Sequence, residues 1–121
     1  MKDLDVYKIE IYIPAEYLEK LQAAITRAGA GKFGMYDYSM AVMQVKGYWR
    51  PLAGAHPFKG EIGQIETADE VKVEINCKHE HIPEVLRSIR EVHPYEVPVI
   101  NILPLMNQYF MGEDGEINYG P

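Results

Sequence analysis

The chain has 121 residues, of which 47% are hydrophobic and 25% are charged, and its net charge is −6. This length predicts one domain with one core. The negative charge argues against general nucleic-acid binders and membrane-surface binders, because both need a basic face. No apolar stretch is long enough to span a bilayer, and the N-terminus has no apolar signal segment, so we expect a cytoplasmic protein without nucleic-acid or membrane partners.

The first half of the chain predicts a strand, a helix and a second strand. Residues 6–13 alternate between apolar and polar side chains, as a half-buried strand does. Residues 15–28 carry apolar side chains at helical spacing, and Gly29 is suited to cap the helix. Residues 32–46, rich in tyrosine and methionine, are expected to form the second strand.

A central loop is expected at residues 47–63, GYWRPLAGAHPFKGEIG. It holds four glycines, two prolines and the only tryptophan, Trp49. Glycine allows positive φ and proline fixes φ, so these residues predict a defined, irregular path. Aromatic side chains give the loop something to pack with. A short strand at residues 61–66 and a turn at residues 67–69 are expected to follow.

The second half repeats the first. Residues 71–77 alternate, and residues 79–92 show helical spacing with a start near residues 80–82, because Pro83 is tolerated only in the first turn. A last strand is expected at residues 95–105, at an edge or with a bulge because of Pro98. The domain then covers residues 1–105, and residues 106–121 form a tail or a terminal hairpin.

The repeat indicates the fold class. Lys8–Ile11 aligns without gaps with Lys72–Ile75. Two strand–helix–strand units in one short chain are typical of an α+β, ferredoxin-like double βαβ sandwich. We expect an antiparallel sheet with both helices on one face. The other face is expected to meet water or a partner's sheet, and would carry Lys8, Glu10, Tyr12, Lys72, Glu74 and Asn76.

Three sequence pieces resemble a known family. They are residues 34–37 (GMYD), 50–60 (RPLAGAHPFKG) and 93–96 (HPYE). Together they resemble the PII-like (CutA-like) domain inserted in proteins of the Nif-three-like family, and small free-standing proteins made of that domain alone. The resemblance covers roughly residues 6–105 and implies the fold, a trimeric assembly and a role in ligand sensing or interaction. The family usually has an asparagine where this chain has Met35.

The resemblance does not extend to the metal site of the full-length family. In those proteins a dinuclear metal site lies in domains that flank the insert, and this sequence has no counterpart of them. Their metal-dependent, hydrolase-like chemistry is therefore not expected here.

The loop and the HPYE piece supply the candidate ligand-binding residues, which with the GMYD piece are Tyr36, Asp37, Arg50, His56, His93, Tyr95 and Glu96. Arg50, with Lys46 and Lys59, suits an anion, because a guanidinium binds phosphate or carboxylate in two hydrogen bonds. Alternatively, Arg50 pairs with an acidic neighbour. For His93 and Tyr95 we favour a structural interpretation, in which His93 interacts with carbonyls at a helix end and Tyr95 packs inward.

A divalent metal is the alternative ligand, with His93, Glu96 and His56 as candidates; no cofactor is required. His79 and His81 also suggest a metal, but side chains two residues apart diverge on a helix, so we favour a solvated helix start. The only cysteine, Cys77, lies in an apolar alternation and is expected to be a reduced, buried thiol.

The sequence thus predicts a non-enzymatic homo-oligomer, favouring a trimer, that binds a small anion or a protein partner at subunit clefts. The alternative is a divalent-metal-binding protein of the CutA-like kind. No P-loop, dinucleotide fingerprint, paired-cysteine motif or nucleophile elbow occurs in the sequence. An enzyme whose site assembles only between subunits is the third and weakest alternative.

Overall fold

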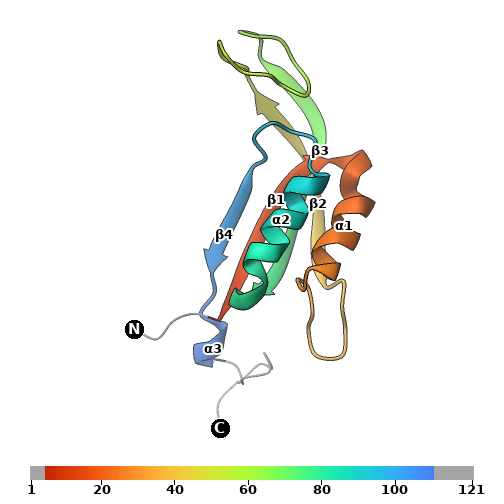
Figure 1. Cartoon of the computed structure of the whole chain (residues 1–121), viewed down its shortest axis with the longest axis vertical. Helices are drawn as coiled ribbons and strands as arrows, with labels where there is room; N and C mark the ends of the chain where they lie inside the picture. Colours follow the sequence, from red (N-terminus) through yellow and green to blue (C-terminus); the bar gives the residue numbers. More distant parts are fainter. Residues whose placement is uncertain (1–4, 111–121) are drawn as a thin grey trace.

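The computed structural model describes residues 5–110, except for the side chain of residue 108. Four antiparallel strands form one sheet in the order β2-β3-β1-β4, and α1 and α2 lie side by side on one face (Figure 1). This is the predicted ferredoxin-like arrangement. The elements are β1 (Val6–Pro14), α1 (Leu18–Arg27), β2 (Met40–Trp49), β3 (Glu66–Lys78), α2 (Ile82–Val92), β4 (Ile100–Pro104) and α3 (Asn107–Phe110).

The core lies between the sheet and the two helices. The alternating apolar residues of β1 and β3 face each other in register, as Ile9 does with Ile75. Both side chains are at most 1% exposed, and Leu21, Ile25, Val85 and Ile89 of the helices close over them. Burial of such side chains stabilises the fold by about 1.5–3 kcal/mol each.

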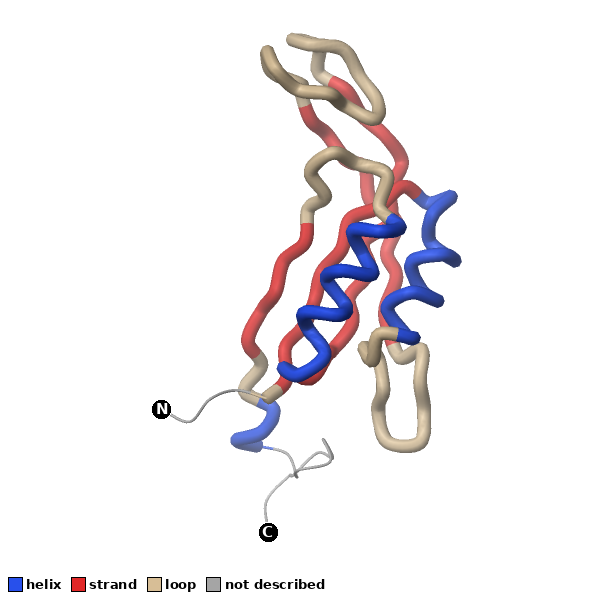
Figure 2. Tube along the Cα trace, viewed as in Figure 1, coloured by secondary structure: helices blue, strands red, loops and turns tan. Residues whose placement is uncertain are grey.

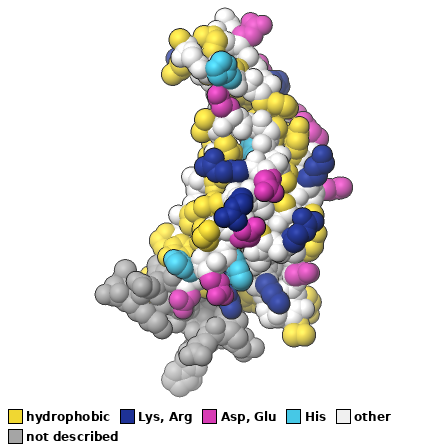
Figure 3. All heavy atoms as spheres, viewed as in Figure 1, with side chains coloured by type: hydrophobic (Ala, Val, Ile, Leu, Met, Phe, Trp, Pro, Cys, Tyr) yellow, Lys and Arg dark blue, Asp and Glu magenta, His cyan; other side chains and the backbone are white. Residues whose placement is uncertain are grey.

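The sheet face opposite the helices, called the open face, carries a connected set of charges. Lys72 Nζ lies 3.1 Å from carboxylate oxygens of both Glu10 and Glu74, and Lys8 Nζ lies 3.2 Å from Glu74. The Glu74 and Glu10 hydrogen bonds raise the pKa of Lys72 above its ordinary range. On the helix-covered side, cationic and anionic side chains are also interspersed (Figure 3).

Long loops lie at both ends of the sheet (Figure 2). Residues 32–39, predicted as the start of a strand, instead form a turn with a bridge between Phe33 and Tyr36. The φ angles of Gly34 and Tyr38 are +58° and +56°, which a strand does not allow. The strand prediction for residues 32–46 was therefore wrong at its first half, and β2 continues to Trp49.

The other end of the β2–β3 hairpin also differs from the prediction. Residues 61–65 form turns rather than a strand, with Gly63 at φ +81°. Thr67–Asp69 is not a turn but part of β3, since it pairs with β2 from Tyr48 to Lys46. The pairing of β1 with β3 ends at Pro14 and Glu70. From there to the central loop the described sheet consists of β2 and β3 alone, and this part is called the β2–β3 ribbon. The central loop accordingly spans residues 50–65.

Helices and the last strand are shorter than predicted. Each helix is preceded by one 3-10 turn, Ala15–Tyr17 before α1 and His79–His81 before α2, so the predicted start of α2 near residues 80–82 is confirmed. β4 begins only at Ile100, because the prolines at 94 and 98 have no N–H to donate to the sheet. It is an edge strand, as predicted.

Only the start of the C-terminal tail lies within the described residues. Residues 107–110 form α3 rather than the first strand of a hairpin, and the N–H of Tyr109 bonds to the Met106 carbonyl. The remainder of the predicted tail or hairpin lies outside the described residues. No helix among residues 5–110 combines the length and apolarity that a membrane crossing requires.

The buried thiol gives a first prediction. Cys77 is free and 2% exposed, and burial raises its pKa to about 11. The ordinary thiol pKa is about 8.5 and the thiolate is the reactive form, so at about pH 8 iodoacetamide should alkylate the native protein on the order of 100-fold more slowly than the urea-unfolded chain. Mass spectrometry of timed samples measures both rates, and equal rates would contradict a buried Cys77.

Candidate functional site

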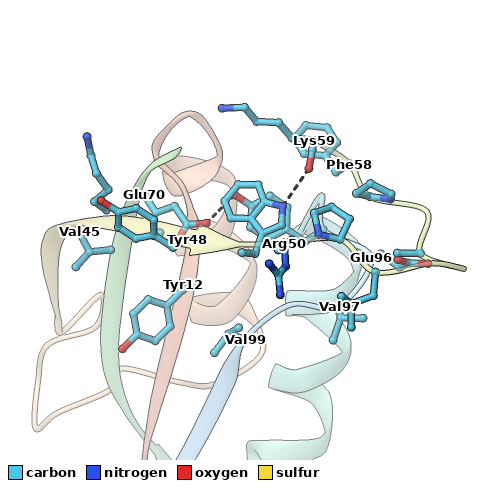
Figure 4. A pocket seen from close by; sticks show the side chains of 18 residues that line it. Tyr12, Val45, Tyr48, Arg50, Phe58, Lys59, Glu70, Glu96, Val97 and Val99 are labelled. Atoms are coloured by element: carbon cyan, nitrogen blue, oxygen red, sulfur yellow. Dashed lines mark hydrogen bonds between the residues drawn. The ribbon is translucent and has the colours of Figure 1, made fainter. Parts of the chain in front are cut away.

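A groove of about 610 Å³ lies where the open face meets the central loop (Figure 4). One side is the end of the β2–β3 ribbon, a second is the central loop, and a third is the segment before β4. Apolar and aromatic side chains dominate its walls. They include Tyr12, Trp49, Phe58, Tyr95, Val97 and Val99.

The central loop is closed by its own hydrogen bonds. The Trp49 indole donates to the Lys59 carbonyl at 3.1 Å, and the Gly63 N–H donates to the Pro51 carbonyl at 2.7 Å. Gly60 has φ +108°, in the region that favours glycine. The loop therefore has the defined path that its composition predicted.

The side chain of His93 is buried, and each of its two ring nitrogens makes a hydrogen bond. It is 7% exposed; its Nε2 lies 2.6 Å from the Tyr12 carbonyl, and its Nδ1 accepts the Tyr95 N–H at 3.2 Å. An imidazole with Nδ1 accepting carries its proton on Nε2, so His93 is neutral and donates to Tyr12. Burial lowers the pKa of His93. His93 thus fastens the segment before β4 to the end of β1.

Tyr95 and Glu70 form the polar floor of the groove. The Tyr95 hydroxyl donates to Glu70 Oε2 at 2.6 Å, and Glu70 is only 7% exposed. Burial, followed by the Glu70 hydrogen bond, raises the pKa of Tyr95 above its ordinary range. Glu70 lies across Gly47 of β2: a Cβ at Gly47 would stand 2.1 Å from Glu70 Oε1. Only glycine therefore accommodates this carboxylate position.

Aromatic rings join the loop to this floor. The Tyr95 ring centroid lies 5.5 Å from that of Trp49 and 6.0 Å from that of Phe58. Phe58 also meets Tyr17 edge-on at 6.3 Å. Tilted contacts at these distances are favourable arrangements of aromatic pairs. The wall of the groove is therefore one continuous ring cluster.

Arg50 is one of three cationic residues that line the groove, with Lys46 and Lys59. Its side chain extends into the space between Tyr12, Val97 and Val99 (Figure 4). Among residues 5–110, no carboxylate or carbonyl pairs with this guanidinium. Lys59, by contrast, is held by the Thr67 carbonyl at 3.2 Å and by Glu66 at 3.8 Å.

The predicted site residues separate into two groups. Arg50, Tyr95 and Glu96 line the groove, and His93 stacks on Tyr95 at 5.0 Å. His56 is exposed and contributes its backbone N–H, which donates to Glu96 at 3.0 Å.

Tyr36 and Asp37 lie elsewhere in the chain. Both are exposed in the turn between α1 and β2, at the opposite end of the sheet from the groove (Figure 1). Within one chain they do not join the other candidates, and their predicted role in ligand binding stays a prediction. Glu70 was not among the predicted site residues, because only the closeness of its carboxylate to Gly47 in the folded sheet points to it.

No metal centre forms within the part of the chain that the structure describes, where no three His, Cys, Asp or Glu side chains gather. Both ring nitrogens of His93 are already engaged. His79 and His81 lie in the 3-10 turn before α2, where His79 contacts the Tyr7 ring at 5.9 Å. The metal candidates His56 and Glu96 remain exposed.

His93 predicts a specific loss of stability in acid. Its folded-state pKa is lowered, so neutral His93 stabilises the fold fully above the ordinary pKa of about 6.5, and this contribution is lost as the pH falls below that value. Urea unfolding at about pH 7.5 and about pH 5 measures the loss. His93→Gln keeps a donor near Nε2 that does not titrate, so this variant should lose less stability on acidification. Equal losses in the two proteins would contradict the assignment.

Comparison with known sequences identifies relatives. The family described as CutA1 divalent ion tolerance protein matches residues 61–111. A Staphylococcus epidermidis protein named GTP cyclohydrolase 1 type 2 homolog is 32% identical over 114 residues, which is 93% of this chain and 31% of that protein. The Mycobacterium tuberculosis protein of the same name is 39% identical over 104 residues, 84% of this chain and 27% of that protein. The chain thus spans about a third or less of the curated relatives it matches.

Solved structures agree on the fold. A Bacillus cereus protein related to NIF3 superposes with a TM-score of 0.76 at 25% identity, covering 88% of this chain and 27% of that one. The periplasmic divalent cation tolerance protein CutA from Archaeoglobus fulgidus gives a TM-score of 0.62 at 19% identity, covering 84% of both chains. The family resemblance predicted from three sequence pieces is confirmed. The chain carries a CutA-like domain, related over most of its length to a segment of the larger NIF3-type proteins.

Proposed function

We propose that the chain is a non-enzymatic, homo-oligomeric binding module whose groove holds a small anion on Arg50. The observation that carries the proposal is the exposed guanidinium of Arg50, which has no described partner and extends between apolar side chains of the groove. A guanidinium in apolar surroundings attracts an anion more strongly than one in bulk water, because the local dielectric is lower. Carboxylates and phosphates match its fork of donors.

The other charged groups of the groove support a binding role rather than a catalytic one. Glu70 accepts from Tyr95, and Glu96 accepts from the His56 N–H. Both carboxylates are thus engaged in holding the loop and the segment before β4. The name GTP cyclohydrolase 1 type 2 homolog belongs to relatives of which this chain covers 31% and 27%.

The open face supports self-association. Lys72, at the centre of this face, is already paired with Glu10 and Glu74. A second copy packing on the face would therefore not leave these charges buried without a partner. Half-exposed apolar side chains lie beside the charges, Met43 in β2 and Leu103 in β4. The family resemblance supports assembly as a trimer, with ligand clefts between subunits.

Divalent-metal binding is the second candidate. It is favoured by the description of the matching family and by the closeness of His56 to Glu96. Because no complete ligand set forms among the described residues of one chain, such a metal would need ligands from another subunit.

Removing the guanidinium should remove anion binding. Calorimetric titration with inorganic phosphate and with acetate is expected to give at least tenfold weaker binding for Arg50→Ala, because a hydrogen bond to a charged group contributes about 1.5–3 kcal/mol. Arg87→Ala is the matched control, since Arg87 is exposed on α2 and pairs with Glu84. Unchanged binding by Arg50→Ala would overturn the anion site. Metal uptake that survives Arg50→Ala but not His56→Ala would favour the second candidate.

Native mass spectrometry of untagged protein should give a trimer. Leu103→Glu places a carboxylate on the open face opposite Lys8 and should shift the trimer toward monomer. Ile102→Glu is its matched control, because Ile102 is 41% exposed against 38% for Leu103 but points to the other face. A wild-type monomer, or equal effects of the two variants in folded protein, would contradict assembly through the open face.

A further inference from the structure

We propose that the groove takes a small amphiphile with one carboxylate on a flat aromatic body, rather than a polyphosphate such as a nucleotide. The inference rests on the proposed anion site at Arg50 and names the chemistry of its ligand. It follows from two properties of the groove, the number of free charges that face its interior and the nature of its walls.

The charges fit one anionic head group. Arg50 offers a planar fork of donors without a described partner, which matches one carboxylate in two hydrogen bonds. Lys59 is already held by Glu66 and the Thr67 carbonyl. Lys46 follows Val45 in β2, and successive strand residues point to opposite faces, so its ammonium is directed away from the face of Val45. Lys46 also lines the groove, but from the opposite face of β2, so Arg50 is the cation whose side chain extends between Tyr12, Val97 and Val99.

Additional phosphates would meet carboxylates. Glu70 lies on the floor of the groove and Glu96 on its outer side, and both line it. Their acceptor oxygens are bonded to Tyr95 and to the His56 N–H. Like charges in a partly apolar site repel each other strongly. A second or third phosphate would thus weaken binding where a monocarboxylate is accommodated.

The walls fit a flat apolar body. Trp49, Phe58 and Tyr95 form one ring cluster with centroid separations of 5.5 and 6.0 Å, and Val97 and Val99 lie opposite Arg50's stem. Ring faces prefer to stack on other rings in tilted or offset arrangements. The volume of about 610 Å³ lies within the range of small-molecule sites, about 300–1,000 Å³. A body of one or two rings fits within such a space while its charged head meets Arg50.

The test uses four probes of matched size or charge. Hydrocinnamate has the carboxylate and the ring, hydrocinnamide lacks the charge, cyclohexylpropanoate lacks the aromaticity, and ADP carries two phosphates. Calorimetry gives each affinity. Trp49 is the only tryptophan and lines the groove, so its fluorescence reports binding at this place. Hydrocinnamate is expected to bind at least tenfold more tightly than hydrocinnamide and ADP, and more tightly than cyclohexylpropanoate.

Variants separate this inference from the proposed function. Arg50→Gln should lose the preference for hydrocinnamate over hydrocinnamide, Arg50→Lys should keep part of it, and Arg87→Ala should keep all of it. ADP or phosphate binding at Arg50 more tightly than hydrocinnamate overturns the ligand class and leaves the anion site standing. Equal affinity for hydrocinnamate and its amide also overturns the class. If no anion binds the folded protein, both proposals fail.

Discussion

The site depends on one hydrogen bond, from the Tyr95 hydroxyl to the buried carboxylate of Glu70. It joins the segment before β4 to β3, and the Glu70 carboxylate takes this position because Gly47 of β2 has no side chain there. Hydrogen bonds to charged groups contribute about 1.5–3 kcal/mol, and a buried carboxylate that loses its donor costs at least as much. The floor of the groove and the position of the Tyr95 ring therefore change together if this bond is lost.

The alternation of apolar and polar residues predicted the central strands of the fold. It failed where hydrogen bonding to a distant strand, or a positive φ angle, decides the local structure. The alternation of residues 6–13 and 71–77 fixed which side chains face the core, because one face of these strands is buried. Thr67–Asp69 has the composition of a turn, yet β2 supplies its ladder partners. The tyrosine-rich residues 32–39 have strand-forming side chains, but positive φ angles at Gly34 and Tyr38 bend them into a turn.

The sequence predicted several residues of the groove, but not which of them hold the structure together and which are available to a ligand. The HPYE piece drew attention to His93 as a ligand, whereas both of its ring nitrogens hold backbone groups together. Arg50 belongs to another of the predicted sequence pieces, residues 50–60, and its guanidinium has no described partner. Glu70 was not identified at all, because its importance arises from Gly47, more than twenty positions earlier in the sequence and directly beside it in space. Such relations exist only in the folded sheet.

The surroundings of Arg50 favour the proposed binding of a small ligand, because little of the backbone would have to be ordered. The preceding residue, Trp49, is fixed by the bond from its indole to the Lys59 carbonyl, and the following residue, Pro51, is buried with its φ set by the ring. The guanidinium is thus carried by backbone that is already in place before a ligand arrives. Ordering flexible groups on binding costs about 0.5–1.5 kcal/mol for each side chain, so a preformed loop leaves more of the interaction free energy for affinity.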